Sequence, residues 1–121
     1  MTLDHPESRC ERGLARLEDV QGSAGVELVA SLGDLGRYIV EFAFGDVISR
    51  PGLSLRDREL VTIACLTLMA GRETQLRTHL EAGLRAGLSA AELEEVIIQT
   101  VPYAGFPTAI NALNLLREIE S

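Results

Sequence analysis

Residues Leu55 to Ala70 form the segment that most constrains the fold, because they are apolar around nearly the whole circumference of a helix. Ser54 precedes the segment and Asp57 follows three residues later, which is typical of a helix N-cap with an acid at the third position. Gly71 is typical of a helix end. A helix that is apolar on all sides has to be buried. The sequence therefore predicts a central helix covered by other elements.

The remaining segments also show helical periodicity rather than the alternation of a β-strand. Ser89 and Glu92 match a capping box at the start of a helix that Pro102 and Gly105 are expected to close. Pro107 suits the first turn of the last helix. The other expected helices cover Pro6 to Asp19, Val26 to Leu32, Asp34 to Val47 and Arg72 to Ala86, with breaks at Gly22, Gly25, Pro51, Gly52 and Gly87.

Short connections between the later helices favour neighbours that pack antiparallel, as in a helical bundle. A chain of 121 residues is long enough to bury one sizeable core. We therefore expect an all-α fold, a compact bundle of about six to seven helices, in a single domain of residues 1–121.

Composition and charge argue against several classes of function. Hydrophobic residues make up 46% of the chain and charged residues 24%, which is typical of a folded protein. A net charge of -7 repels phosphate backbones and anionic lipids, so we expect no nucleic acid or membrane partner. The stretch from Leu60 to Ala70 is too short to cross a bilayer. The N-terminus has no pattern of an export signal, so we expect a cytoplasmic protein.

The cysteines and histidines do not form a recognisable metal or redox motif. Cys10 and Cys65 lie far apart and form no Cys-x-x-Cys pair, and Cys65 is expected to be buried on a stripe with Val61, Ala64 and Leu68. His5 and His79 lie in unrelated segments, so we expect no metal site. No glycine-rich loop follows a strand and no nucleophile turn is visible, which argues against nucleotide binding and a serine hydrolase.

His79 is the first candidate for chemistry. It shares a helical stripe with Leu76, Leu80 and Gly83, so its imidazole is expected to point toward apolar neighbours. Gln75 lies one turn earlier and could orient the ring or hold a ligand beside it. Imidazole can give and take a proton near neutral pH. A core histidine hydrogen-bonded to a backbone carbonyl fits the same pattern, so both interpretations stay open.

Glu59 is the second candidate, one turn into the apolar helix on the face continued by Ile63 and Leu66. A buried carboxylate is costly unless it is paired. Two other interpretations stay open: a first-turn acid that favours the helix dipole, or a salt bridge to Arg56 or Arg58.

Two further positions could hold a carboxylated ligand. Tyr103 and Gly105 lie at a junction where the last helix exposes unpaired N–H groups, which can receive an anion, although a turn closed by a packed tyrosine is an equal alternative. Arg50 could bind a carboxylate through two hydrogen bonds, or be a surface or interface residue.

The stretches RPGLSLRDRELVTIACLTLMAG, QLRTHLEAGLRAGLS and EEVIIQTVPYAGFPTAINAL, in this order, resemble the carboxymuconolactone decarboxylase family. The resemblance extends from about Tyr38 to Leu115. This family also contains the alkylhydroperoxidase D proteins and is all-helical. The resemblance implies that the chain assembles into a ring-shaped homo-oligomer, commonly a trimer or hexamer. Such assembly would cover apolar surface that a small domain cannot bury alone.

The family divides by chemistry, and the residues before His79 bear on the division. Peroxidase-type members use a Cys-x-x-Cys dithiol that a glutamate and histidine activate. Arg72 and Gln75 occupy those positions here, so this dithiol is lacking. Decarboxylase-type members act on a carboxylated lactone, lose CO₂ and reprotonate the remaining carbanion, with no cofactor. Decarboxylases of the catabolic pathway often have glutamate where this chain has Gln75.

The resemblance implies a role for each candidate residue. His79 corresponds to the proton donor or acceptor, and Glu59 to the relay partner that sets its protonation. Gln75 and Tyr103 are expected to position the substrate, with Arg50 as a carboxylate anchor supplied from a neighbouring subunit. We therefore predict a decarboxylase-like lyase that acts without a cofactor on a small carboxylated substrate.

Three alternatives stay open. The first is alkylhydroperoxidase-like peroxide reduction through Cys65 or another thiol outside the motif. The second is a scaffold or small-molecule-binding oligomer that has the fold without turnover. The third is proton transfer on another acid at the same site.

Overall fold

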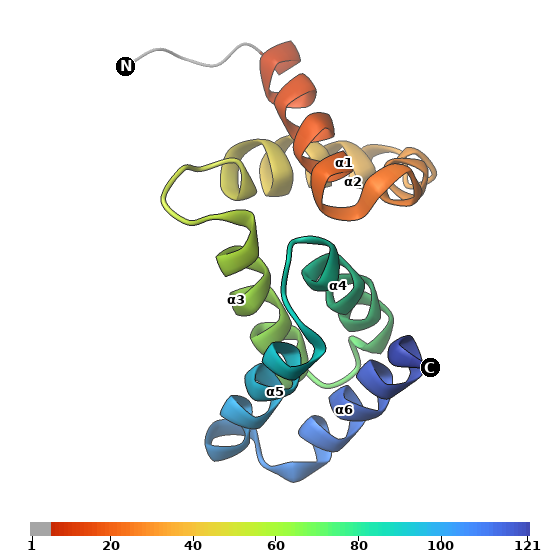
Figure 1. Ribbon diagram of the computed structural model, residues 1–121. Coiled ribbons are helices and arrows are strands. Elements are labelled where there is room, and N and C mark those ends of the chain that lie inside the picture. Colours follow the sequence, from red (N-terminus) through yellow and green to blue (C-terminus); the bar gives the residue numbers. More distant parts are fainter. Residues whose placement is uncertain (1–5) are drawn as a thin grey trace. The chain divides into compact units, whose positions relative to one another are not determined.

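The computed structural model describes residues 6–121, and all regular elements in this range are helices (Figure 1). The prediction of an all-α protein with six to seven helices is confirmed for this range. Internal contacts divide the chain into two compact units, residues 1–53 and 54–121. The expectation of a single domain stays a prediction, because a division by contacts does not say whether either unit folds alone.

The first unit contains α1 (Pro6–Ala30), α2 (Asp34–Tyr38) and the π-helix η1 (Ile39–Ile48). The predicted break at Gly22 is confirmed, because this residue leaves helical geometry with φ 70° and ψ -165°. Gly25 stays helical, so the break predicted there is wrong. Only glycine adopts such a φ readily, which explains why α1 bends where it does.

The helix predicted for Asp34 to Val47 is an α-helix only as far as Tyr38 and then continues with π geometry. Its end shows the wider spacing, since the Ser49 N–H donates to the Phe44 carbonyl five residues back at 3.1 Å. Apolar residues spaced three to five apart fit both geometries, so periodicity could not distinguish them.

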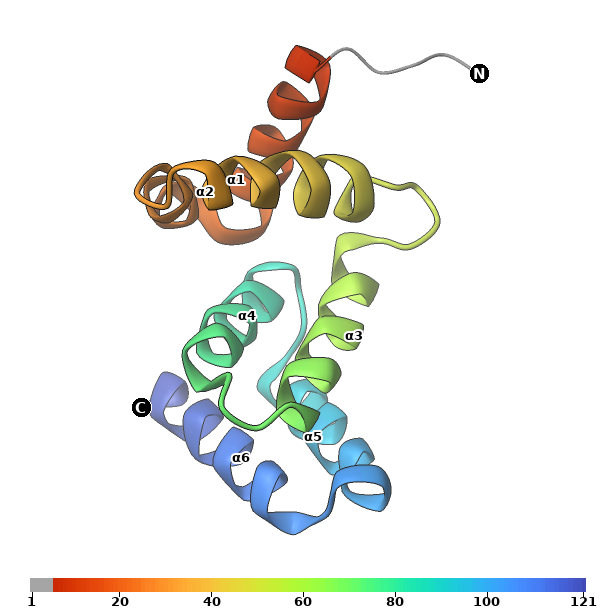
Figure 2. The ribbon, with the colours of Figure 1, turned by 180° about the vertical axis from the view of Figure 1, so that it is seen from behind.

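The second unit contains α3 (Leu55–Leu68), α4 (Glu73–Arg85), α5 (Ala90–Ala104) and α6 (Phe106–Glu120). Figures 1 and 2 show α5 and α6 as a helical hairpin joined by a short turn. Helix α3 contacts α4 and α5, and α6 contacts the same two helices. Side chains from all four helices form the core, and its largest fully buried members are Ile63, Leu80, Leu93 and Leu116.

The predicted helix starts in this unit are confirmed. The Ser54 hydroxyl accepts a hydrogen bond from the Asp57 N–H at 3.1 Å. Ser89 and Glu92 form both hydrogen bonds of a capping box, each at 3.0 Å. Gly87 has φ 103°, the left-handed conformation expected after a helix.

Pro102 does not close α5, so that part of the prediction is wrong. The helix runs two residues further, and the Gly105 N–H donates to the Val101 carbonyl at 2.9 Å. Proline removes one N–H from the helix interior but does not prevent the next turn from forming. Pro107 lies in the first turn of α6, as predicted.

The expectation that α3 is buried on all sides is also wrong. Glu59, Ile63 and Thr67 are buried, whereas Val61 is 56% exposed and Cys65 is exposed on another face. The predicted burial of Cys65 is therefore corrected. A continuous apolar pattern does not by itself show which faces of a helix the fold covers.

Within residues 6–121, none of the helices combines the length and apolar character needed to span a bilayer. The cytoplasmic location stays a prediction. His5, which entered the argument on metal sites, lies outside the described residues.

Candidate functional site

Glu59 and His79 lie against each other in the second unit, although 20 positions separate them in the sequence. The Nδ1 atom of His79 is 3.0 Å from Oε2 of Glu59. The Glu59 side chain is 4% exposed and the His79 side chain is 16% exposed. The two residues with the strongest proton-transfer prediction are thus brought together, mostly shielded from water.

The packing of α3 on α4 brings this pair together. Glu59, Ile63 and Thr67 recur every four residues on the buried face of α3, so the carboxylate points where the helix is covered. Gly83 lies one turn after His79 on α4, and a Cβ at this glycine would lie 3.0 Å from Cδ1 of Ile63. The absence of a side chain at Gly83 therefore lets α4 approach α3 closely.

The hydrogen bond fixes which atoms of the pair are available for chemistry. When the carboxylate of Glu59 is the acceptor, Nδ1 of His79 is the donor. The Nε2 atom is then the ring nitrogen that can exchange a proton with a ligand. Because Glu59 is buried, its charge depends on this partner for stabilisation.

The geometry bears on one of the open alternatives for each residue. The hydrogen-bond partner of the His79 ring is the Glu59 carboxylate. The alternative of a structural core histidine expected a backbone carbonyl in this place. Arg56 forms ion pairs with Glu92 and Asp57, so the salt bridge proposed between Arg56 and Glu59 is not what the structure shows.

Gln75 and Arg72 lie on the same side of α4 as the pair but in solvent. Gln75 is exposed one turn before His79. Arg72 is the exposed N-cap residue, and its Nη1 donates to the Ala70 carbonyl at 3.2 Å. The role of Gln75 beside His79 therefore stays a prediction that rests on the helical spacing.

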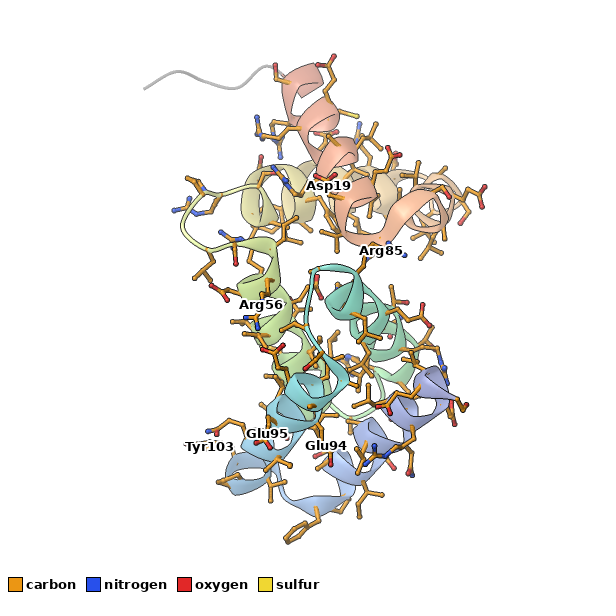
Figure 3. The ribbon with its side chains drawn as sticks, in the orientation of Figure 1. Asp19, Arg56, Arg85, Glu94, Glu95 and Tyr103 are labelled. Carbon is orange, nitrogen blue, oxygen red and sulfur yellow. The ribbon has the colours of Figure 1, made fainter. Side chains whose placement is uncertain are left out.

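Tyr103 is not held beside the pair in the way that its proposed role requires. It lies in the last turn of α5 and is 78% exposed. In Figure 3 its side chain points away from the helical bundle of its unit. Among residues 6–121, no hydrogen bond joins the Tyr103 side chain to Glu59 or His79, so its role stays a prediction.

Arg50 belongs to the first unit, where its N–H donates to the Val47 carbonyl at 3.1 Å. Its side chain is exposed. Its role as a carboxylate anchor stays a prediction, since it depends on groups outside this unit.

Two apolar grooves lie on the second unit, and sequence reasoning missed both. One has a volume of about 610 Å³ between α3 and α5. The other has a volume of about 450 Å³ between α5 and α6. Neither is lined by Glu59, His79 or Tyr103. The signal that could have revealed the first groove is the apolar stripe through Val61 and Ala64, which was interpreted as core.

Within residues 6–121, no three of the histidine, cysteine, aspartate and glutamate side chains come together as a metal site would require. Cys65 is an exposed free thiol and Cys10 is a half-buried one.

Comparison with known protein families shows to which family this chain belongs. The sequence model of the carboxymuconolactone decarboxylase family matches residues 33–118. The chain belongs to the carboxymuconolactone decarboxylase family. Its match covers α2, η1 and the whole second unit except the last residues of α6, and so includes both members of the Glu59–His79 pair.

Three known proteins are similar to this chain in sequence. The chain is 39% identical to a 4-carboxymuconolactone decarboxylase of Acinetobacter baylyi, over 93% of the chain and 87% of that relative. It is 32% identical to an uncharacterized protein of Paracoccus denitrificans, over 67% of the chain and 61% of that relative. It is 31% identical to a nitrosuccinic acid decarboxylase of Metarhizium robertsii, over 62% of the chain and 52% of that relative.

Proposed function

We propose that this protein is a decarboxylase that acts on a small carboxylated lactone or a related acid, with His79 as the proton carrier. The main support for this proposal is the contact of 3.0 Å between His79 Nδ1 and Glu59 Oε2. Two of the relatives described above are named as decarboxylases. Their different names indicate that the family's scaffold serves more than one carboxylated substrate.

The proposed step is a decarboxylation that needs no cofactor. The bond between the carboxylate carbon and its neighbour breaks, and the electron pair moves into the adjacent carbonyl group to give an enolate. CO₂ leaves. The enolate carbon then takes a proton from Nε2 of His79, and solvent returns a proton to the ring.

Glu59 supports this step through the other ring nitrogen. By accepting from Nδ1, it fixes the ring orientation and stabilises the imidazolium form that donates the proton. Gln75, exposed one turn away on α4, is proposed to orient the substrate. Arg50 and Tyr103 are proposed to complete the site as a carboxylate anchor and a positioning group, each from this chain or a neighbouring copy.

We further propose that the chain works as a homo-oligomer, a trimer or hexamer. Support comes from large apolar side chains that one chain leaves in solvent, including Val61, Ile98 and Phe106, which are 56%, 51% and 69% exposed. Apolar surfaces of this kind are typical of association sites.

The experiment is to assay CO₂ release from carboxylated muconolactone by the wild type, His79→Gln and Glu59→Gln. Loss of the proton carrier is expected to lower kcat by about 10²–10⁴-fold. Glu81→Gln, an exposed glutamate on the same helix, is the matched control and is expected to keep full turnover. If both pair variants turn over as fast as Glu81→Gln, the relay is refuted.

A second candidate is peroxide reduction through a single thiol, favoured by the exposure of Cys65. Peroxide would oxidise the thiolate to a sulfenic acid, and an external thiol would reduce it again. Cys65→Ser is expected to abolish such an activity. Unchanged peroxide consumption in Cys65→Ser would eliminate this candidate function. Neither outcome changes what the decarboxylase assay tests.

A further inference from the structure

The first unit contains a pocket of about 240 Å³ whose residues take no part in the proposed proton transfer. Its apolar wall includes Leu14, Val26 and Val29 from α1 and Val40 from η1. The first three of these residues precede the stretch that matches the family model. The pocket therefore depends on a part of the chain that the family match does not include.

The pocket carries one cationic group, Arg37. Its side chain is 58% exposed, so the guanidinium stands at the rim while the apolar side chains form the wall. Its Nε lies 3.8 Å from a Glu41 oxygen, which is a long contact, and Glu41 is shared with Arg9 at 3.4 Å. Neither Glu41 nor Asp34 lines the pocket. The two carboxylates therefore stand outside the wall, but an anion in the pocket still has to compete with Glu41 for Arg37.

Volume and chemistry together define the class of ligand. The volume of 240 Å³ is below the roughly 300–1,000 Å³ that is usual for drug-sized ligands, so the ligand has to be small. An apolar wall with one cation at its rim matches an aliphatic chain that ends in a carboxylate. We propose that this pocket binds a small aliphatic monocarboxylic acid, with the chain against α1 and η1 and the carboxylate on Arg37.

Cys10 provides a direct readout, because its half-buried thiol lies in the pocket wall. The test measures alkylation of Cys10 by iodoacetamide in the full chain, with octanoate as the probe, by mass spectrometry of the separated peptides. Bound octanoate is expected to slow alkylation of Cys10 in a saturable way. Cys65 lies outside the pocket and is exposed, so its alkylation in the same sample is the internal control.

Two substitutions, each with a matched control, test whether octanoate is recognised by Arg37 and bound inside the pocket. Arg37→Gln is expected to raise the octanoate concentration for half protection about tenfold, whereas Arg16→Gln, on α1 outside the pocket, should leave it unchanged. Val26→Phe fills the pocket and should remove protection, whereas Leu28→Phe, which is not in the wall, should preserve it. Far-UV circular dichroism verifies that each variant keeps its helices.

The proposal makes equally definite negative predictions. Octanol has the same chain without the carboxylate, so it should protect Cys10 much less than octanoate does. Equal protection by octanol and octanoate would overturn carboxylate recognition. Protection that is absent from the wild type, or is the same for Cys10 and Cys65, would overturn the site itself. None of these results depends on whether the chain decarboxylates a substrate.

Discussion

Glu59 and His79 are joined across the α3–α4 interface by a contact of 3.0 Å between Oε2 and Nδ1. The carboxylate side chain is 4% exposed, so water contributes little to its stabilisation. Removing one member of such a pair leaves the other buried without its partner, whereas replacing both by apolar residues avoids that cost. The pair therefore couples stability to the proposed chemistry.

This coupling predicts a strong departure from additivity. His79→Leu is expected to lower the free energy of unfolding by roughly 3 kcal/mol, because Glu59 is left buried and unpaired. The double variant Glu59→Leu/His79→Leu is expected to recover most of this loss while staying inactive. Urea denaturation of the four proteins of the cycle measures the coupling. If the double variant loses as much unfolding free energy as the two single variants together, the two side chains are not buried as a pair.

Two buried glycines predict a graded response to an added methyl group. A Cβ at Gly13 would lie 2.0 Å from the Val40 carbonyl oxygen, and backbone cannot move aside cheaply. A Cβ at Gly83 would lie 3.0 Å from Cδ1 of Ile63, which is the end of a flexible side chain. Gly13→Ala is therefore expected to cost about 3 kcal/mol or more, and Gly83→Ala about 1 kcal/mol. Thermal unfolding monitored by circular dichroism measures both, and the reverse order would contradict the close packing of α1 on η1.

The Asp46 carboxylate predicts a loss of stability in acid. Hydrogen bonds from Arg9 to both of its oxygens, at 3.0 and 2.7 Å, lower the pKa of Asp46 below its ordinary value of 3.8. A group with a lowered folded-state pKa stabilises the fold above its ordinary value, and this contribution disappears as the pH falls through the folded-state pKa. Asp46→Asn should therefore be less stable than the wild type at neutral pH and approach it in acid. Urea midpoints across this pH range test the prediction, with exposed Asp34→Asn as the control.

Most of the second unit was predictable from the sequence because its signals are local. Ser54 and Ser89 each cap the next helix through atoms three residues away, which a sequence displays directly. The pairing of Glu59 with His79 was predictable in a different way. Each residue lies on the apolar face of its own helix, and the family resemblance indicated that these two faces meet.

The remainder could not be predicted, because it depends on what covers a surface. Cys65 and Val61 have the same apolar character as Ile63, yet they lie on a face of α3 that this chain leaves exposed. The π geometry of η1 has no distinctive periodicity. Tyr103 looked like a closing residue in the sequence but stands 78% exposed. In each case the decisive information lies outside the local sequence pattern.

The proposed oligomer makes a prediction about the α5–α6 corner. Ile98, Phe106 and Ile110 line the groove of about 450 Å³ there, and they are 51%, 69% and 55% exposed. Burying these side chains between copies would stabilise an assembly, and a charge introduced among them would oppose it.

Ile110→Lys is therefore expected to shift the protein from an oligomer to a monomer in size-exclusion chromatography with light scattering. Asn114→Lys, one turn further along α6, is exposed and lies outside the groove, so it is the matched control and should keep the wild-type mass. A wild type that is monomeric at micromolar concentration would contradict the oligomer proposal. Equal masses for the wild type and Ile110→Lys would place the interface elsewhere. If Tyr103 completes the site across copies, Ile110→Lys should also lose decarboxylation while the contact between Glu59 and His79 stays intact.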